Sequence, residues 1–517
     1  MFCHLGFYTS IPVSSMKDDL RQQNKPPAAS REQGAEEATC GYLFLVEFGG
    51  RNGLCCPCCR LPQVPGEPSR LLTSSVHTAV ESLRLSQVSG RKSLTNRPGR
   101  AILGSYRREQ ERIMANCLVA QSGGPTAVIN SSLAGVVRAN QLNPLYGRVF
   151  GGLYGIEGTL DDQLYDLTNL TGHDIELLQQ TPSSALGTCR YKLKRGNDAD
   201  YHRLVEVMDA HDITTMFYIG GNDSMDTVDA LAEWARDNAP GKRFIGIPKT
   251  VDNDLVPVDH CPGFPSAAKV ACEITHATRL DYDAYTRPEV FVLEVMGRDA
   301  GWLAASCCVT GDVDLLVLPE VDFDREAFLT EVRKKFEETG KCYIVTSEGA
   351  HYADGTYLSA GKAADDGFAH AVLGGAAAAI KQMIVDAGIV PRGIVQDLSR
   401  AARSSNFAQS IVDRTEAWEL GLSAHMRSAD PAFTGQVVGV RRDEEAAAEG
   451  LYNARFFAAP ASEFANFVRH FPSEWILPAY QGIAPEALDY FRPLIKGEPR
   501  VVMDGGIPAT IVPFNRR

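Results

Sequence analysis

Hydrophobic and polar positions alternate in a regular way from Met114 to the end of the chain. Short apolar runs occupy residues 117–120, 216–219, 244–247, 290–295, 315–318, 343–345 and 437–440, and longer amphipathic stretches separate several of them. The clearest helical pattern repeats every third residue at Met225, Val228, Leu231 and Trp234, with Ser224 as the expected N-cap. Strand, loop and helix repeated in this order predict a doubly wound α/β fold with mostly parallel sheets.

Residues 1–113 differ from the rest of the chain. They show little periodicity, carry repeated prolines, and hold six of the 13 cysteines, four of them in the cluster 55–59. The cluster could bind zinc, but it lacks spaced CxxC pairs and histidines. The opening residues lack the features of a signal or transit peptide. We expect residues 1–113 to be a disordered extension, or upstream sequence read from a start placed too early, and residues 114–517 to be the catalytic region.

Charge and composition limit the classes of function. The first 113 residues hold 15 Lys and Arg against 10 Asp and Glu, the remainder holds 36 against 54, and the whole chain has a net charge of −13. A nucleic-acid partner needs a basic face, so this balance argues against one. No apolar run reaches about 18 residues, so no membrane span is expected. The scattered cysteines after residue 113 are typical of reduced thiols and predict a cytoplasmic protein.

Two glycine-containing loops follow apolar runs and lead into helices. The first contains Gly123 and Gly124 and precedes a helix expected over 131–139, and the second reads Gly-Gly-Asn-Asp-Ser over 220–224. In a parallel sheet such loops meet at the carboxyl ends of the strands. Glycine lets backbone N–H groups approach a phosphate, and a helix N-terminus adds partial positive charge. Either loop alone could be an ordinary turn, but together they favour a site for an oligophosphate.

Three later loops bring charged side chains to the same edge. Lys249, Asp252 and Asp254 lie in the loop 248–254, Arg298 follows the run 290–295, and Glu348 follows the run 343–345. Neighbouring carboxylates raise one another's pKa, which suits a general base, and a cation can hold what the base acts on. The alternatives to a site are that the loop 248–254 is only a solvated acidic turn and that Arg298 is only a surface arginine.

In order, the motifs GGPTAVIN, GGNDS, PKTVDND, MGRDAGW and SEGA resemble those of the phosphofructokinases, specifically the pyrophosphate-dependent branch. The resemblance covers about 400 residues from Met114. It implies two interleaved α/β lobes with the active site between them. It also implies phosphorylation of fructose 6-phosphate to fructose 1,6-bisphosphate by pyrophosphate in glycolysis, reversibly, by a homodimer or larger homo-oligomer.

The resemblance also implies roles for residues on the sugar side. Asp252 matches the base that takes the proton of the 1-hydroxyl. The other positions implied to bind fructose 6-phosphate are Thr250, Asp254, Met296, Gly297, Arg298, Glu348 and Arg400. A sugar-phosphate motif late in the family's sequence corresponds here to Asp-Leu-Ser-Arg over 397–400, and only Arg400 matches it. Arg287 and Arg392 are further candidates for binding phosphate, and the site they reach could belong to a neighbouring subunit.

On the donor side, the resemblance implies that pyrophosphate is bound by Gly123, Gly124, Arg190 and Lys249. The metal is Mg²⁺, with Asn222 and Asp254 as its implied positions. Asn222 stands where the family usually has aspartate, and an amide oxygen is a weaker ligand for a hard cation.

The choice of donor rests on Asp223 and Lys249. ATP-using relatives have glycine at both positions, and the Asp223 carboxylate would repel an α-phosphate. An alternative is that Asp223 and Lys249 merely pair with each other. The rival functions are an ATP-dependent phosphofructokinase and a non-catalytic regulatory subunit that binds sugar phosphate, although the latter should lack Asp252 or Arg298. Ala134 replaces the first effector-pocket arginine of allosteric relatives, while Arg138 keeps the second, so we expect a non-allosteric enzyme.

Overall fold

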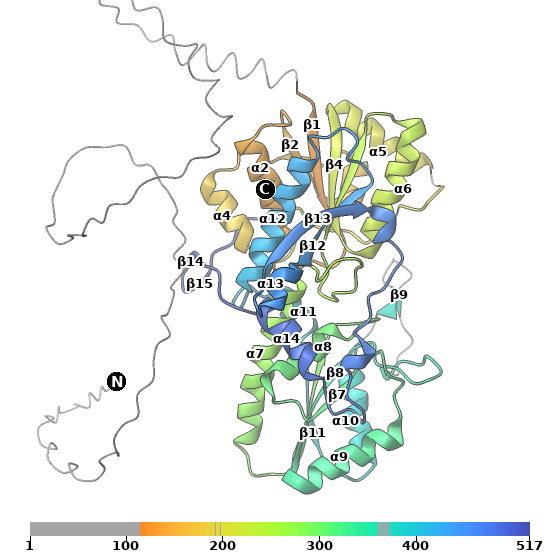
Figure 1. The fold of residues 1–517 in the computed structure, drawn as a ribbon, viewed down its shortest axis with the longest axis vertical. Coiled ribbons are helices and arrows are strands. Elements are labelled where there is room, and N and C mark those ends of the chain that lie inside the picture. Colours follow the sequence, from red (N-terminus) through yellow and green to blue (C-terminus); the bar gives the residue numbers. More distant parts are fainter. Residues whose placement is uncertain (1–113, 192, 197, 360–363, 366–370, 373) are drawn as a thin grey trace, which may run out of the picture. The chain divides into compact units, whose positions relative to one another are not determined.

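The computed structural model describes residues 114–517 except for residues 192, 197, 360–363, 366–370 and 373. The extension expected over residues 1–113, with its cysteine cluster, lies outside the described residues. Each apolar run that the pattern predicted forms a strand. The described chain builds two main sheets with helices on both faces (Figure 1), which confirms the doubly wound α/β architecture.

The first sheet has seven strands in the order β13-β12-β5-β4-β1-β2-β3. Its five central strands pair in parallel, and the two edge strands, β3 and β13, pair antiparallel. The strands are β1 (Asn116–Gln121), β2 (Val149–Gly152), β3 (Leu164–Asp166), β4 (Ile213–Gly220), β5 (Arg243–Pro248), β12 (Gln436–Arg442) and β13 (Ala454–Pro460). Because both faces are covered, successive residues of β1 are all buried, and the strand appears in the sequence as a continuous apolar run.

Helices cover the two faces of this sheet. One face packs against α2 (Ile129–Leu142) and α12 (Ile411–Arg427), and the other against α3 (Gly155–Leu160), α5 (Asp198–Ala210) and α6 (Asn222–Asn238). The remaining helices of this part are α4 (Gly172–Gln180) and α13 (Glu444–Ala448). The axes of α2 and α12 approach at two glycines: a Cβ on Gly135 would lie 2.3 Å from the backbone oxygen of Trp418, and one on Gly421 would lie 2.2 Å from that of Ser132. Any side chain at these positions would push the two helices apart.

The second sheet has four strands, all parallel, in the order β11-β6-β8-β7. They are β6 (Glu289–Val295), β7 (Leu315–Val317), β8 (Lys341–Ser347) and β11 (Gly393–Asp397). One face packs against α7 (Phe264–Asp283), α8 (Trp302–Ser306) and α14 (Pro485–Leu494), and the other against α9 (Arg325–Thr339) and α10 (Ala376–Asp386). The short α11 (Ser399–Arg403) follows β11.

The chain leaves the first sheet after β5, builds the second sheet, and returns to the first with β12, which pairs in parallel with β5. The blue segments of Figure 1 show this return. Minor elements complete the chain: β9 (Ala364–Asp365) with β10 (Ala371–Val372), β14 (Met503–Asp504) with β15 (Ile507–Pro508), and 3₁₀ turns at Cys307–Thr310, Ala461–Glu463, Ser473–Trp475 and Phe514–Arg516. Segments far apart in the sequence therefore lie side by side in the first sheet.

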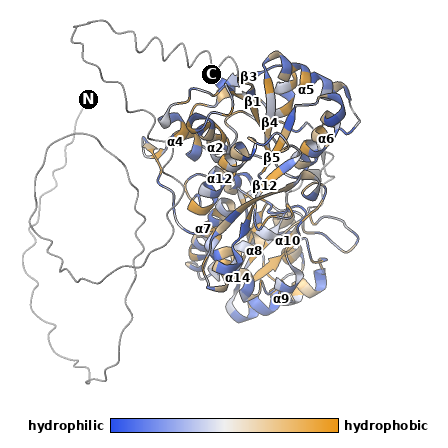
Figure 2. Cartoon of the chain, turned by 45° about the horizontal axis from the view of Figure 1, so that its top comes forward, coloured by the Kyte–Doolittle hydropathy of each residue, from blue (hydrophilic) through white to orange (hydrophobic). Residues whose placement is uncertain are grey.

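Hydropathy follows this layering. Figure 2 shows hydrophobic colouring along central strands such as β4 and β5, and more hydrophilic colouring on helix surfaces that face away from the sheets. In the part of the chain that the structure describes, we find no helix with the length and apolar character needed to cross a membrane.

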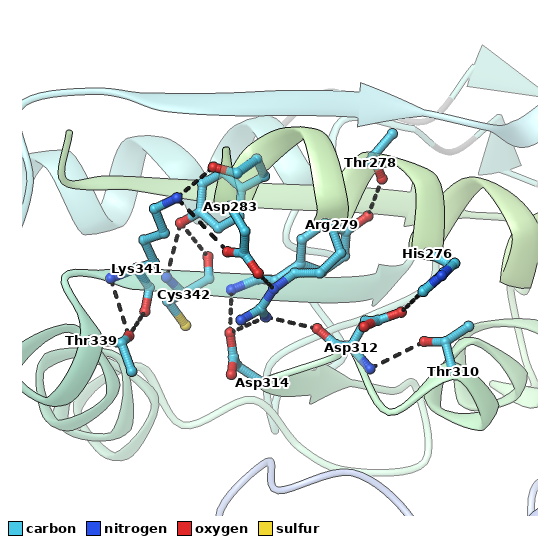
Figure 3. Close-up of polar contacts among 12 residues, drawn as sticks. His276, Thr278, Arg279, Asp283, Thr310, Asp312, Asp314, Thr339, Lys341 and Cys342 are labelled. Carbon is cyan, nitrogen blue, oxygen red and sulfur yellow. Dashed lines mark hydrogen bonds and ion pairs between the residues drawn. The ribbon is translucent and has the colours of Figure 1, made fainter. Parts of the chain in front are cut away.

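A polar network fixes the C-terminal half of α7 to the amino ends of β7 and β8 (Figure 3). The Arg279 guanidinium donates to the Asp283 carboxylate, to the backbone carbonyl of Asp312 and to the Asp314 carboxylate, each at 2.8 Å. Asp314 also accepts the backbone N–H of Tyr343 at 2.8 Å. At its other end α7 follows Gly263, which forms a β-bridge with Thr250. The helix is therefore held at both ends, and its N-terminal end supports the loop that carries Asp252.

Two expectations about secondary structure need correction. Ser224 is not the N-cap of α6: Gly221 takes that position, and Ser224 lies inside the first turn. Its side chain packs against Gly220, where a Cβ would lie only 2.0 Å from the Ser224 hydroxyl oxygen, so it is occupied with packing rather than capping. The helix that was expected over 131–139 begins at Ile129 and ends at Leu142. The pattern along α6 is confirmed, since Met225, Val228 and Leu231 are buried.

Candidate active site

A cavity of about 420 Å³ opens at the carboxyl ends of the strands and draws its walls from both sheets. The loops after β1, β4 and β5 contribute from the first sheet, and the loop after β6 contributes from the second. Among the predicted site residues, those that line the cavity are Gly123, Gly124, Arg190, Asn222, Asp223, Lys249, Thr250, Asp252, Asp254, Met296 and Arg298. Gly297, Glu348 and Arg400 are absent from its lining.

A larger cavity, of about 960 Å³, lies at the opposite edge of the first sheet beside Tyr146, Thr214 and Arg243. None of the predicted site residues lines it. The Arg243 guanidinium donates to the backbone carbonyl of Ser428 and to the Tyr146 hydroxyl, so the cation is already used by the protein. The cavity of about 420 Å³, which the predicted residues line, is therefore the candidate active site.

The first wall of the site is the turn at Gly123 and Gly124. Gly123 has φ +73°, a conformation that a residue with a side chain adopts only under strain, and the Thr188 hydroxyl donates to its carbonyl at 2.8 Å. The Lys249 ammonium donates to the carbonyl of Gly124 at 2.7 Å, although Lys249 is only 3% exposed. Burial, followed by the charge of Arg403, lowers the pKa of Lys249 to about 7, against the opposing effect of the Asp252 and Asp254 carboxylates. A buried ammonium thus touches the turn where a donor phosphate would lie.

The second wall begins with α6, whose first residue, Asn222, lines the cavity. The Asn222 amide is engaged on both sides: its oxygen accepts the backbone N–H of Asn466 at 2.7 Å, and its nitrogen donates to the carbonyl of Phe467 at 2.6 Å. These bonds hold the segment 466–468 against the cavity, where Asn466 and Val468 join the lining. An oxygen that already accepts an N–H has one fewer lone pair for a cation, so coordination by Asn222 stays a prediction.

The third loop carries two carboxylates, Asp252 and Asp254. Burial raises the pKa of Asp252, and the charge of Arg298 acts in the opposite direction. Burial and then the Asp252 charge raise the pKa of Asp254 to about 7. Among the described residues, Asp252 Oδ1 is buried without a hydrogen-bond partner. An unpaired buried carboxylate oxygen at a cavity wall is free to accept a proton or a hydrogen bond from a bound molecule.

The fourth and fifth loops are joined through their backbones. Gly297 accepts the Ser347 hydroxyl and the backbone N–H of Gly349, the latter at 3.1 Å. Arg298 donates to Asp299 at 2.8 Å; burial alone would lower the pKa of Arg298, but Asp299 raises it. Burial and then the Asp252 charge raise the pKa of Glu348 to about 7. Glu348 therefore interacts electrostatically with Asp252 although it lies outside the cavity lining.

The carboxylate pair fits a magnesium ion. Mg²⁺ binds through one or two carboxylates together with waters and substrate phosphates, rather than in a cage made only by protein. Asp252 and Asp254 supply such a pair, and Asp252 keeps a buried oxygen unused. In the part of the chain that the structure describes, no group of three or more His, Cys, Asp or Glu residues could hold a metal by itself. Any metal here would therefore depend on substrate oxygens.

Three arginines that were predicted to bind phosphate do not line this cavity. Arg400 is exposed on α11. Arg287 and Arg392 flank the amino ends of β6 and β11 and form ion pairs with the buried Glu289, at 3.4 and 3.3 Å. That edge of the second sheet is opposite to the edge that carries the cavity, because all four strands are parallel.

Sequence reasoning missed two parts of the site. Arg403, the last residue of α11, lines the cavity, and the spacing of three between Arg400 and Arg403 was a signal that both lie on one side of a helix. The segment with Asn466 and Val468 gave no signal, since only the fold brings it to Asn222, 244 residues earlier.

Two α/β lobes, a glycine turn with a buried lysine and two arginines beside it, and carboxylates on another wall are the features of a two-lobed phosphotransferase. The family model of the phosphofructokinases matches residues 116–426. The pyrophosphate–fructose 6-phosphate 1-phosphotransferase of Halomonas elongata is 38% identical over 405 residues, which cover 76% of this chain and 94% of that protein. The enzyme of the same name from Methylococcus capsulatus is 39% identical over the same share of each chain.

A solved structure with the same fold agrees with the family match. The crystal structure of the pyrophosphate-dependent phosphofructokinase of Marinobacter aquaeolei superposes with a TM-score of 0.69 and 34% identity, covering 77% of this chain and 95% of that chain. The chain belongs to the phosphofructokinase family.

Proposed function

We infer that the protein transfers a phosphoryl group from pyrophosphate to the 1-hydroxyl of fructose 6-phosphate and forms fructose 1,6-bisphosphate and phosphate. The observation that carries this inference is the buried Lys249 ammonium, which contacts Gly124 at 2.7 Å in the cavity that Asp223 and Asp252 also line. The names of the relatives, each at least 38% identical over nearly their full length, agree with it.

Asp252 has the geometry of a general base. Its unpaired Oδ1 would accept the proton of the 1-hydroxyl while the hydroxyl oxygen forms a bond to the transferred phosphorus. The bridging P–O bond of pyrophosphate breaks at the same time, and phosphate leaves with the bridging oxygen. The Thr250 hydroxyl accepts the backbone N–H of Asp252 at 3.1 Å and so orients the loop.

Cations stabilise the charge that the transfer redistributes. Lys249, beside Gly124, and Arg190 line the donor wall, and Arg298 lines the wall that the second sheet contributes. Fixed cations in a partly dry site need no reorganisation during the reaction, so they lower the barrier more than they would in water. Arg298 is held in place by Asp299, and its charge acts on Asp252, which keeps that carboxylate closer to its ionised form.

We propose Mg²⁺ as the metal, with Asp254 as its principal protein ligand, Asp252 nearby and Asn222 as a further candidate. When bound, the ion would neutralise phosphate charge. A reversible reaction in glycolysis, a cytoplasmic location and a homodimeric or larger assembly stay predictions. Weak or absent allosteric control is supported by Ala134, which is fully buried in α2 and has no side chain that could reach an anionic effector.

The test of the function is a direct comparison of donors. The full chain is supplied with fructose 6-phosphate, Mg²⁺ and either pyrophosphate or ATP at matched concentrations, and fructose 1,6-bisphosphate is measured. We expect turnover with pyrophosphate and at least a hundredfold less with ATP, because repulsion of several kcal/mol between Asp223 and an α-phosphate corresponds to about two or more factors of ten. Equal turnover with the two donors would contradict the inference.

A further inference from the structure

Arg403 reaches from the second lobe to the donor wall of the cavity. It ends α11, which follows the last strand of the second sheet, yet its Nη1 lies 2.9 Å from the point where a Cβ on Gly124 would be. Gly124 follows β1, an inner strand of the first sheet that lies between β4 and β2. A guanidinium can occupy this place only because residue 124 has no side chain. Arg403 and Lys249 thus approach the same glycine turn from different lobes.

The guanidinium of Arg403 is incompletely satisfied by the protein. Its Nε is buried and, within the described residues, finds no hydrogen-bond partner. Arginine has five N–H donors in a planar fork that matches phosphate oxygens, and burying such a donor unpaired costs free energy. Arg298, in the same cavity, differs because Asp299 accepts its Nε–H at 2.8 Å. An anion in the cavity would supply the partner that Arg403 lacks.

The charges around Arg403 also favour an anion of high charge. Burial, and then the neighbouring charges of Arg400 and Arg190, lower the pKa of Arg403, so these cations repel one another. In addition to burial, the charges of Arg403 and Arg190 lower the pKa of Lys249, because they also repel its ammonium. The Asp252 and Glu348 carboxylates oppose it only in part. A multiply charged phosphate placed among Arg190, Lys249 and Arg403 would convert this repulsion into attraction.

We propose that Arg403 is a pyrophosphate-binding residue that the second lobe supplies to the glycine turn of the first. The proposal rests on the proposed function and assigns a residue to its donor site. The donor site is then complete only when both lobes contribute to it. The same short helix, α11, carries Arg403 and also Arg400, the residue predicted to bind the sugar phosphate. Pyrophosphate contacts made by Lys249 and Arg190 alone would hold the donor less tightly.

The test compares Arg403→Gln, Arg403→Lys and the control Arg325→Gln in the full chain. Arg325 is an exposed arginine at the start of α9, away from the cavity. Steady-state kinetics give kcat and the KM of each substrate, and calorimetry gives the affinity for fructose 6-phosphate without donor. For Arg403→Gln we expect the KM of pyrophosphate to rise about 10- to 100-fold, as the loss of charge-assisted hydrogen bonds predicts. The affinity for fructose 6-phosphate should stay within about twofold.

Two further readouts separate binding from a structural role. Arg403→Lys, which keeps the charge but loses the fork, should fall between the unmodified enzyme and Arg403→Gln. Added guanidinium should partly restore pyrophosphate use in Arg403→Gln and leave Arg325→Gln unchanged. In the reverse reaction, the KM of inorganic phosphate should rise in Arg403→Gln.

The failures can be distinguished. An unmodified chain without pyrophosphate-dependent turnover contradicts the proposed function. An active unmodified chain with an unchanged KM of pyrophosphate in Arg403→Gln, or with a loss confined to fructose 6-phosphate, overturns the role of Arg403 alone. If Arg403→Gln does not fold, Arg403→Lys decides: an unchanged KM of pyrophosphate and of phosphate would overturn the proposal.

Discussion

The side-chain amide of Asn253 donates a hydrogen bond to the phenolic oxygen of Tyr490 at 3.0 Å, across 237 residues of sequence. Asn253 lies between Asp252 and Asp254 and adopts φ +58°, and its own oxygen accepts the backbone N–H of Cys261 at 2.9 Å. Tyr490 belongs to α14, near the end of the chain. The residue between the two candidate carboxylates is therefore held in an uncommon conformation by contacts on both sides.

Tyr490→Phe should reduce kcat by about ten- to a hundredfold, because the loop that carries Asp252 loses a fixed contact. The substitution also removes the partner of an Arg469 N–H at 2.9 Å and of the Asp259 carbonyl at 2.7 Å, which should cost about 1–3 kcal/mol of stability. Kinetics and urea unfolding measure both effects. Tyr480→Phe is the matched control, since its hydroxyl accepts the Asp324 N–H at 2.9 Å away from the site. If both variants keep kcat, the contact has no role in positioning.

Asp252→Asn should lower kcat by about a thousandfold or more and leave fructose 6-phosphate bound, because it removes the proton acceptor and keeps the shape. Turnover and equilibrium binding of the sugar phosphate are measured together. Asp322→Asn, on an exposed loop, is the control and should behave like the unmodified enzyme. Near-normal turnover of Asp252→Asn would place the base at another residue.

Lys249→Ala should depress pyrophosphate turnover far more than sugar-phosphate binding, since the ammonium touches the donor turn at Gly124. Combining Asp223→Gly with Lys249→Gly should raise the use of ATP relative to pyrophosphate, because both changes open space and the first removes a repulsive carboxylate. The measurement is kcat/KM for each donor at matched Mg²⁺. If the ratio of kcat/KM for ATP to kcat/KM for pyrophosphate does not change, residues other than Asp223 and Lys249 determine the donor specificity.

Stability should fall with acid because of His425. This side chain is fully buried, its Nε2 faces the Asn140 oxygen at 3.1 Å, and Nδ1 has no partner among the described residues. Burial lowers the pKa of His425 to about 4, against an ordinary value of 6.5. A depressed folded-state pKa gives stability that is complete above pH 6.5 and is lost as the pH falls toward 4, by up to about 3 kcal/mol.

His425→Gln should therefore flatten the dependence of unfolding free energy on pH between 6.5 and 4. The amide can still donate to Asn140 but does not titrate. His276→Gln, whose side chain is exposed beside Asp312, should keep the slope of the unmodified protein. Equal slopes in all three proteins would show that His425 is not the titrating group.

A chain that starts at Met114 should fold and turn over like the full-length protein. β1 begins at Asn116, and charge and cysteine content change at the same place in the sequence. Solubility, thermal unfolding and kcat of the two proteins are compared. An insoluble or inactive truncated chain would show that residues 1–113 contribute to the catalytic region.

The sequence alone predicted most inner strands of the two sheets and the loops that follow them. Seven apolar runs became seven strands because a strand buried on both faces needs apolar residues at every position, and that need is visible locally. The glycine turn and the acidic loop were also visible, because phosphate binding and proton transfer require particular side chains at short spacing. Strands such as β2 (VFGG) and β13 at or near the sheet edges were missed, since glycines or partly exposed residues break the apolar pattern.

The tertiary structure decided which distant residues complete the site. Three contacts show this: Asn466 with Asn222, Tyr490 with Asn253, and Arg403 with Gly124. No local sequence pattern indicates these pairs, because each contact joins segments that only the packing of the two sheets brings together. The same holds for Ser224, whose residue type favours an N-cap but whose hydroxyl packs against Gly220 inside the helix. Short-range patterns determine elements and chemistry, whereas the packing of elements determines which polar groups find partners within the protein and which, like Arg403 Nε and Asp252 Oδ1, remain available to a substrate.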